Sequence, residues 1–203
     1  MPQLETILPR MPENPIAKFD TWYTEVRRPG TLKHPTAVCV STVDRAGQPE
    51  ARFVDLKRFD ESGFVFTTSF DSPKGISLYH NSAIALTFWW DHFGRQVRVR
   101  GSAARLSLKE NQELFRQRPR DAQLATWASR QSVILEDPKA LHVSFREVQE
   151  KFDIEEIPCP DYWGGFLVIP LSIEFLTFQS DRLHQRILFT RNSGDWDVVI
   201  LQP

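Results

Sequence analysis

The sequence contains few of the residues that build metal centres or disulfide frameworks. Only two cysteines occur among its 203 residues, Cys39 and Cys159, and their wide separation gives neither a CxxC redox pair nor a ligand cluster. The five histidines show no paired spacing such as HExxH or HxH. We therefore expect no metal site, and we expect both cysteines to be small packed hydrophobic residues.

Long apolar runs and an excess of charge of one sign are also absent. No stretch approaches the roughly 20 consecutive apolar residues that span a bilayer, and the first residues lack the basic segment and apolar run of a signal peptide. With 25 Lys and Arg against 26 Asp and Glu, the net charge is -1, so the surface as a whole cannot act as a basic footprint for nucleic acid. We expect a cytoplasmic protein that binds neither membrane nor nucleic acid, in which any anion site is a local concentration of positive charge.

The composition supports one globular domain. Hydrophobic residues make up 41% of the chain and charged residues 25%, which is close to the average for soluble proteins. The 203 residues allow one domain or two small ones, against a prior of roughly 150 residues per domain. Residues 1–13 have no periodic pattern and are expected to form a mobile N-terminal arm. We therefore expect a single domain over residues 14–203.

Short β-rich runs dominate the chain and are interrupted by a few helices. Helix starts are signalled by Asn14-Pro15, Ser72-Pro73, Asp137-Pro138 and the capping box Ser107-x-x-Glu110. The patterns predict helices from 14 to 28, 72 to 80, 107 to 117 and 137 to 152, and strands over 37–43, 51–57, 64–68, 83–90, 96–106, 165–169, 172–178, 182–190 and 195–201. Because most strands follow one another in tandem, a mainly β fold with helices (α+β), built as a decorated β-barrel, is favoured over alternating βαβ units. Neither G-x-G-x-x-G nor a P-loop occurs, so any nucleotide-like cofactor must be held by a different fold.

Three features suit contact with an anion or a heterocycle, and each also has an ordinary structural interpretation. Lys74 lies in the first turn of a predicted helix, where backbone N–H groups favour phosphate, but it is equally interpretable as a solvated lysine. Arg182, His184 and Arg186 alternate along a predicted strand, which places three donors on one side, either in a pocket or in water. The run at 127–132 is polar enough to touch a ligand or to form a loop.

Short motifs follow one another in a fixed order over nearly the whole chain. They are Arg52-x4-Lys57, Phe64-Val-Phe-x-Thr68, Ser72-x-Lys74-Gly75, Arg95-Gln-Val97, Arg118-Pro-Arg120, Trp127-Ala-Ser-x-Gln-Ser132, Trp163-Gly-Gly165, Ile173-Glu-Phe175 and Arg182-Leu-His-x-Arg186. Together they resemble the pyridoxamine 5′-phosphate oxidase family, and several ordered motifs are far more specific than any single one. The resemblance implies an FMN-binding split β-barrel that forms a homodimer, with flavin mononucleotide (FMN) at the subunit interface and no metal.

The resemblance also assigns roles position by position. The FMN contacts would be Arg52, Thr67, Thr68, Lys74, Gln96, Gln131, Ser132 and Arg186, with Arg52 and Lys74 holding the FMN phosphate. The substrate contacts would be Lys57 and Arg118 at the substrate phosphate, with Arg182 and His184 over the pyridine ring as the catalytic pair. Strand parity puts Arg52 and Lys57 on opposite faces of one strand, which agrees with their separate roles.

The reaction implied by the resemblance belongs to vitamin B6 metabolism. A hydride moves from the aminomethyl or hydroxymethyl carbon of a phosphorylated pyridine to the flavin, and oxygen then reoxidises the flavin. The products are pyridoxal 5′-phosphate and hydrogen peroxide. The flavin carries the redox chemistry, while the protein orients the reacting carbon and balances two phosphate dianions. Arg182 and His184 would position and polarise the substrate, and neither is expected to be an obligatory base.

Five positions depart from the family pattern. Pro73 stands where an Arg beside the flavin phosphate is usual, and Leu176 stands where a Trp contacts the flavin. Leu114 and Ala122 replace a Tyr and a Ser that bind the substrate phosphate, and Gln185 replaces an Asp. Three functions remain open: a vitamin B6 oxidase with a loosened phosphate pocket, a paralogue that oxidises another reduced ring as phenazine-biosynthesis oxidases do, and a noncatalytic protein that binds flavin or pyridoxal phosphate.

Overall fold

The structure, a computed structural model, describes residues 14–203, so the arm expected at residues 1–13 lies outside the described residues. The strands are β1 (Ala37–Val43), β2 (Pro49–Asp60), β3 (Gly63–Ser69), β4 (Ala83–Trp90), β5 (Arg95–Arg105), β6 (Trp163–Thr177), β7 (Gln185–Asn192) and β8 (Asp195–Leu201). The helices are α1 (Pro15–Val26), α2 (Pro73–His80), the short 3-10 helix η2 (Asp91–Phe93), α3 (Leu108–Arg116), α4 (Arg120–Ala128) and α5 (Pro138–Phe152).

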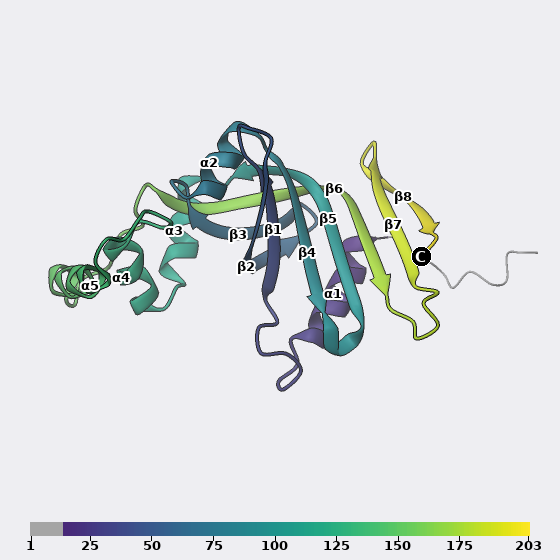
Figure 1. The fold of residues 1–203 in the computed structure, drawn as a ribbon, viewed down its shortest axis with the longest axis horizontal. Helices are drawn as coiled ribbons and strands as arrows, with labels where there is room; N and C mark the ends of the chain where they lie inside the picture. Colours follow the sequence, from purple (N-terminus) through teal and green to yellow (C-terminus); the bar gives the residue numbers. More distant parts are fainter. Residues whose placement is uncertain (1–13) are drawn as a thin grey trace, which may run out of the picture.

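The eight strands form one antiparallel sheet that closes on itself in part. Their order is β3-β2-β1-β4-β5-β6-β7-β8, and β3 also pairs with β6. Six strands therefore close into a barrel, while β7 and β8 extend the sheet beyond it (Figure 1). The predicted barrel fold is confirmed.

Strand β6 belongs to both the barrel and its extension. Its first half pairs with β3 and its second half pairs with β7, while β5 runs along most of its other edge. The partner changes near Pro170, which lies opposite Gly101 where the register with β5 shifts. Proline lacks an N–H and is tolerated at such a bulge. The prediction of two separate strands on either side of Pro170 is therefore wrong, because the proline interrupts the ladder without ending the strand.

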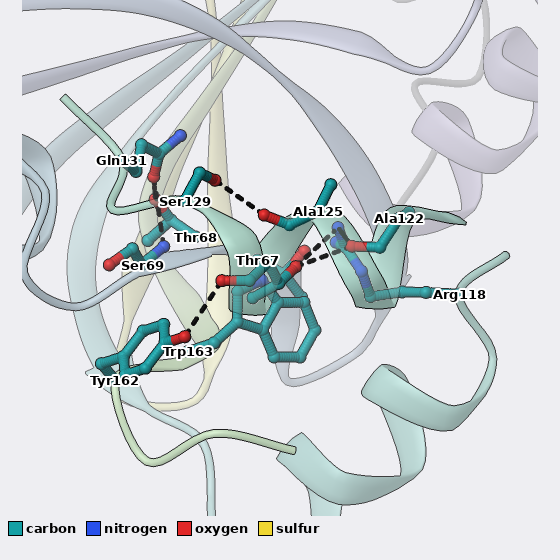
Figure 2. Close-up of a pocket in the computed structure, with 11 residues that line it drawn as sticks. Thr67, Thr68, Ser69, Arg118, Ala122, Ala125, Ser129, Gln131, Tyr162 and Trp163 are labelled. Atoms are coloured by element: carbon teal, nitrogen blue, oxygen red, sulfur yellow. Dashed lines mark hydrogen bonds between the residues drawn. The ribbon is translucent and has the colours of Figure 1, made fainter. Parts of the chain in front are cut away.

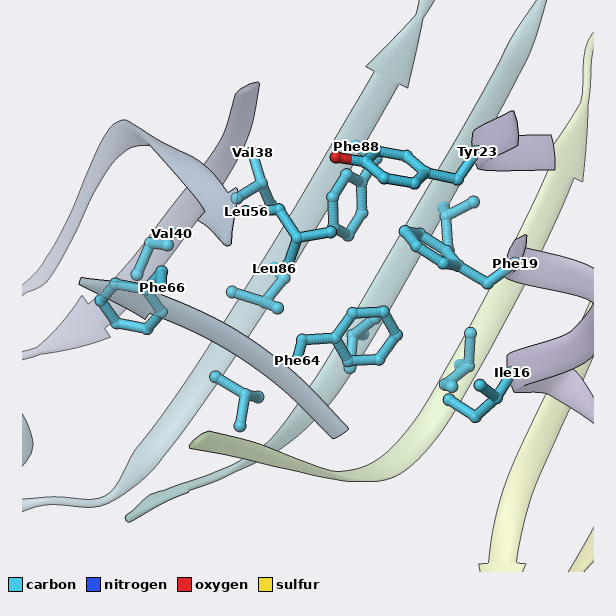
Figure 3. Packing of buried hydrophobic residues seen from close by; sticks show 14 of the residues in the cluster. Ile16, Phe19, Tyr23, Val38, Val40, Leu56, Phe64, Phe66, Leu86 and Phe88 are labelled. Carbon is cyan, nitrogen blue, oxygen red and sulfur yellow. The ribbon is translucent and has the colours of Figure 1, made fainter. Parts of the chain in front are cut away.

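The barrel interior is filled by aromatic and branched side chains, against which α1 packs (Figure 3). Helix α1 begins at the predicted cap, where Asn14 Oδ1 accepts hydrogen bonds from two N–H groups of the first turn. Phe19 of this helix is fully buried. The ring centroids of Phe59, Phe64 and Phe88 lie 4.8, 5.0 and 5.0 Å from that of Phe19, all at edge-to-face angles. Phe19 therefore links the helix to three barrel strands.

Helices α3, α4 and α5 build a second, smaller core outside the barrel. The core consists of the buried residues Phe115, Leu124, Phe152, Ile157 and Trp163. In Figure 1 the α4–α5 pair lies at the opposite end of the molecule from β7 and β8. Helices α2, α3 and α5 begin at the predicted caps. No helix within residues 14–203 is long and apolar enough to cross a membrane.

The sequence patterns do not predict α4. Its N-cap is Pro119, which makes no side-chain hydrogen bond to the helix, so the usual start signal is missing. The helix is held by tertiary contacts: Leu124 is buried in the second core, and Gln123 Nε2 donates to carbonyls of the preceding turn. Consequently only the second part of the polar run at 127–132 lies in a loop.

The position of Phe19 leads to a stability prediction. Phe19→Ala should lower the free energy of unfolding by about 3–5 kcal/mol, because it removes a fully buried ring and leaves a cavity among three others. Urea unfolding followed by circular dichroism measures this change. The matched control is Ile154→Ala, since Ile154 is 92% exposed and its truncation should change the value by less than about 0.5 kcal/mol. A loss below about 1 kcal/mol for Phe19→Ala would contradict its central place in the core.

Candidate functional site

Two neighbouring cavities lie between the barrel and the α3–α5 helices. The first has a volume of about 360 Å³ and is lined by Thr67, Thr68, Ser69, Arg118, Ala122, Ala125, Thr126, Ser129, Gln131, Tyr162 and Trp163 (Figure 2). The second has a volume of about 340 Å³ and is lined by Asp55, Lys57, Thr67, Leu114, Gln117, Arg118, Pro119, Ala122 and Trp163. Because four residues line both cavities, we treat the two as parts of one site, called here the first and the second cavity.

Beside the first cavity, Lys74 is buried in a ring of oxygen atoms. Its Nζ donates to Thr68 Oγ1 at 3.1 Å, to Ser72 Oγ at 3.3 Å and to Gln131 Oε1 at 3.4 Å. The residue is only 5% exposed, and in the described part of the chain no carboxylate lies within ion-pair distance of it. The interpretation of Lys74 as a solvated lysine is therefore wrong. A buried cation in the first turn of a helix is suited to receive an anion.

The charges around Lys74 are unbalanced. Burial lowers the pKa of Lys74, and the positive charge of Arg52 lowers it further, while Glu50 acts in the opposite direction. Arg52 is held by Glu50 at 2.6 Å and by the Thr42 hydroxyl at 2.8 Å. One carboxylate thus faces two cations, and these are the two residues for which the resemblance implies a shared phosphate.

Gln131 attaches the loop after α4 to the barrel. Its Oε1 accepts hydrogen bonds from Thr68 Oγ1 at 2.9 Å and from the backbone N–H of Ser69 at 3.2 Å, besides the one from Lys74 (Figure 2). The next residue, Ser132, is exposed and has φ 67°, in the left-handed region. The predicted cofactor residues of β3, α2 and this loop therefore lie close together.

Arg118 lies between the two cavities. Its guanidinium is 4.9 Å from the ring centroid of Trp163, and Nη2 donates to the carbonyl of Ala122 at 3.1 Å and to Thr126 Oγ1 at 3.4 Å. Among residues 14–203, its buried Nε has no hydrogen-bond partner. Burial lowers the pKa of Arg118. Within the described residues this cation, like Lys74, has neutral partners and no carboxylate in ion-pair contact.

The second cavity also contains an ion pair. Lys57 Nζ lies 3.4 Å from Asp55 Oδ2, and both side chains are on the face of β2 opposite to that of Arg52 and buried Leu56. The predicted separation of Arg52 and Lys57 onto opposite faces is confirmed. Sequence reasoning missed Asp55, although its two-residue spacing from Lys57 on one strand was a sufficient signal.

Two further predicted cofactor residues lie elsewhere, on the outward face of the barrel strands. Gln96 of β5 is paired with Leu176 of β6, which is paired in turn with Arg186 of β7. Arg186 Nε donates to Glu174 Oε1 at 2.8 Å, and its Nη1 donates to the carbonyl of Gln202 at 3.0 Å. Neither Gln96 nor Arg186 lines the first or the second cavity.

Arg182 and His184 lie in the turn before β7. The prediction that they alternate with Arg186 along one strand is wrong, because β7 begins only at Gln185. Asp181 Oδ1 accepts a hydrogen bond from the Leu183 N–H at 2.9 Å, and Arg182 has φ 70°, so this segment is a tight turn. His184 Nδ1 accepts from the backbone N–H of Gln179 at 3.1 Å, and a neutral ring therefore carries its proton on Nε2.

The predicted site residues thus form two groups that one chain does not bring together. The cavity group consists of Arg52, Lys57, Thr67, Thr68, Lys74, Arg118, Gln131 and Ser132, and the outer-face group consists of Gln96, Arg182, His184 and Arg186. Residues of α4 line both cavities, and in Figure 1 this helix and strand β7 lie at opposite ends of the molecule.

Sequence reasoning missed several cavity residues besides Asp55. Trp163, known from the sequence only as part of the motif Trp163-Gly-Gly165, is 5% exposed and lines both cavities. The Tyr162 hydroxyl donates to the carbonyl of Thr126 at 3.0 Å across the first cavity (Figure 2). Thr126 carried no signal, since the helix that positions it was not predicted, whereas Ser129 belongs to the polar run at 127–132.

Comparison with known proteins gives matches over most of the chain. Residues 29–152 match the family described as "Pyridoxamine 5'-phosphate oxidase", and residues 163–203 match the "Pyridoxine 5'-phosphate oxidase C-terminal dimerisation region". The chain is 45% identical over 193 residues to proteins named pyridoxine/pyridoxamine 5′-phosphate oxidase from Shewanella denitrificans and from Shewanella amazonensis, in each case over 95% of this chain and 91% of the relative.

Solved structures with a similar fold include one close match. PhzG from Burkholderia lata, solved in complex with tetrahydrophenazine-1-carboxylic acid, superposes with a TM-score of 0.90 at 28% identity, over 96% of this chain and 95% of that chain. A pyridoxamine 5′-phosphate oxidase-related, FMN binding protein from Nostoc punctiforme superposes with a TM-score of 0.76 at 16% identity, over 95% of this chain and 100% of that chain. The second match concerns the fold alone.

The burial of Lys74 predicts how stability varies with pH. Folding lowers the pKa of Lys74 below its ordinary value of 10.5, so the unfolded state binds more protons between the two pKa values. The stability of the protein therefore gains from Lys74 as pH rises through that interval. Lys74→Met lacks this contribution. The free energy of unfolding of the wild type minus that of Lys74→Met should therefore increase as pH is raised from neutral toward 10.5, as measured by urea unfolding at several pH values. A difference that falls with pH would contradict the buried, charged Lys74 described here.

Proposed function

The chain belongs to the pyridoxamine 5′-phosphate oxidase family of oxidoreductases, and on that premise we propose that it binds FMN and oxidises pyridoxamine and pyridoxine 5′-phosphates to pyridoxal 5′-phosphate. Oxygen is the proposed acceptor, and hydrogen peroxide is a product with both substrates. With the pyridoxamine substrate, water supplies the aldehyde oxygen and the nitrogen leaves as ammonia. The observation that carries the proposal is a pair of cations beside adjoining cavities, the buried Lys74 and the half-buried Arg118, both of which have neutral partners. A phosphorylated cofactor and a phosphorylated substrate supply two anions for such a pair.

The cavity group fits the phosphate end of FMN. Lys74 and Arg52 supply positive charge, and the hydroxyls of Thr68 and Ser72 with the Gln131 amide supply neutral partners that a bound phosphate can share. Pro73, at the first position of α2, leaves the helix start open but adds no charge of its own. Bound FMN would supply the site with a two-electron acceptor.

The protein's own residues then orient the substrate. Lys57 and Arg118 bind the anionic end in the second cavity, where Leu114 and Trp163 give an apolar wall for a ring. His184 presents its Nε2–H, since its Nδ1 is held by the backbone N–H of Gln179. It can donate a hydrogen bond to a ring substituent without first taking up a proton. No side chain is required as a nucleophile.

The outer-face group must come from a second subunit if it is to reach the same ligands. Gln96, Arg182, His184 and Arg186 lie away from both cavities of their own chain. A homodimer that apposes the outward face of β5–β7 with the cavities of its partner brings the groups together. The match of residues 163–203 to a dimerisation region supports this arrangement, because that segment carries most of the outer-face group.

A second candidate is an oxidase that acts on a reduced ring bearing a carboxylate. The likeness to PhzG, whose solved complex contains such a ligand, favours it. So does the second cavity, where Leu114 and Ala122 offer no hydrogen bond to a phosphate. Both candidates share the flavin chemistry and differ in the anionic end of the substrate.

The function is tested by anaerobic mixing of FMN-loaded protein with pyridoxamine 5′-phosphate and with pyridoxine 5′-phosphate. The visible absorption of the flavin should bleach within the turnover time and return when oxygen is admitted, with pyridoxal 5′-phosphate and peroxide formed in equal amounts. A flavin that stays yellow with both substrates would refute the vitamin B6 activity. Bleaching by a reduced aryl carboxylate alone would instead favour the second candidate.

The two-subunit site predicts complementation between inactive variants. Arg118→Met damages the cavity group, and Arg182→Ala damages the outer-face group. The kcat/KM of each variant homodimer should fall at least about tenfold, because each change removes a hydrogen bond to a charged group. After subunit exchange, half of the dimers are mixed, and each mixed dimer has one undamaged site. Activity should therefore recover to about a quarter of the wild-type value, as expected for a two-fold symmetric pair.

The matched control mixes Lys74→Met with Arg118→Met. Both changes lie in the cavity group, so every site in a mixed dimer keeps one defect and activity should stay low. Recovery in the control, or none in the first mixture, would refute the assembly of the site from two chains.

A further inference from the structure

Asp55 stands out among the residues of the second cavity, because the proposed function gives it no role. It lies on β2, two residues before Lys57, and its Oδ2 is 3.4 Å from Lys57 Nζ. Its other oxygen, Oδ1, accepts a hydrogen bond from the Thr36 hydroxyl at 2.9 Å. The carboxylate is therefore held in place on the cavity wall beside a predicted substrate-binding lysine.

Asp55 changes the charge of the cavity. The charged side chains that line it, within residues 14–203, are Asp55, Lys57 and Arg118, which sum to one positive charge. Without Asp55 the sum would be two. The influence of Asp55 extends to Arg118, where its negative charge raises the pKa against the larger lowering by burial. An anion in this cavity therefore meets one surplus positive charge and not two.

The remaining wall gives little help to a doubly charged group. Leu114, Pro119 and Ala122 have apolar side chains, which leaves Thr67, Gln117 and the indole N–H of Trp163 as the neutral hydrogen-bonding groups of the lining side chains. A phosphate-monoester dianion needs both charge balance and several donors for its three oxygens. A carboxylate or a sulfate ester carries only one negative charge, so it needs less positive charge around it and fewer hydrogen-bond donors.

We propose that Asp55 is a specificity-determining residue that shifts the preference of the second cavity away from phosphate-monoester dianions and toward aryl monoanions such as carboxylates. The inference rests on the proposed function in one respect, the use of this cavity for the anionic end of the substrate. It deepens that function, because it identifies the residue that separates its two candidate substrate classes.

Coulomb's law gives the expected effect of removing the charge. The interaction of Asp55 with a ligand is proportional to the ligand's charge, so its loss affects the logarithm of the affinity twice as much for a dianion as for a monoanion. At a separation of about 6 Å and an effective dielectric constant of about 60, suited to a half-exposed site, the effect is about fivefold for a single charge and about 25-fold for a double charge. The ratio of the two affinities should thus change about fivefold.

The experiment uses two probes of nearly equal shape, phenyl phosphate and phenyl sulfate, with FMN-loaded protein at pH 8. The phosphate ester is then a dianion, because its second pKa is about 6, and the sulfate ester is a monoanion. Asp55→Asn keeps the size of the side chain and an acceptor for Thr36. Titration calorimetry should show that the Kd of phenyl phosphate falls about 25-fold in this variant and that of phenyl sulfate about fivefold.

Two controls make the result specific. Asp20→Asn on the exposed face of α1 makes the same change in net charge and should leave both dissociation constants within about twofold of the wild type. Arg118→Met should weaken both probes by at least about tenfold, which locates them in the cavity. Equal changes for the two probes in Asp55→Asn, no change, or binding that survives Arg118→Met would overturn the proposal. So would a wild type that binds neither probe at millimolar concentration.

The measurement is independent of turnover, so the two proposals can fail separately. If the flavin does not bleach with vitamin B6 phosphates but the probes respond as expected, the oxidase assignment fails and the role of Asp55 stands. If the flavin bleaches and the probes respond equally, the role of Asp55 fails and the oxidase assignment stands.

Discussion

The pairing of β6 with three neighbours is the constraint on which the architecture depends. One edge of this strand follows β5, and the other edge closes the barrel with β3 before it turns to β7. The first half therefore borders the cavities through Trp163, and the second half supports the outer-face group through Glu174 and Leu176. A single continuous strand thus separates the two groups of predicted site residues by its own length, and the two-subunit site that we propose would unite them.

Within the described residues, the main electrostatic feature of the cavities is positive charge at Lys74 and Arg118 without a carboxylate in ion-pair contact. Lys74 is buried and Arg118 is half-buried, and their hydroxyl, amide, carbonyl and aromatic partners satisfy part of their hydrogen bonding and none of their charge. Burying unpaired cations costs stability, and proteins retain such arrangements where function requires them. In the second cavity, by contrast, the Asp55 carboxylate reduces the positive charge that surrounds a bound ligand.

Local signals were enough to predict much of this fold. Polar caps before proline marked the starts of α1, α2 and α5, and the capping box at Ser107 marked α3, because those side chains satisfy free N–H groups at a helix start. Alternation on β2 correctly separated Arg52 from Lys57. The errors occurred where tertiary contacts decide: α4 lacks a side-chain cap, β6 continues through Pro170, and the turn at Arg182 delays β7. Residue roles came from the family resemblance, while the division into two groups required the fold itself.

The uncapped start of α4 has a consequence for how ligands enter and leave. Apart from Leu124 in the second core, its anchors are neighbouring loop segments: Gln123 binds the preceding turn, Trp127 Nε1 donates to the carbonyl of Pro158, and Tyr162 donates to Thr126. Few of these contacts involve the aromatic interior of the barrel. Such a segment is a candidate for sub-global unfolding, in which a peripheral unit opens at a lower free energy than the whole domain. Because residues of α4 line both cavities, opening of this one helix would uncover both of them while the barrel stayed intact.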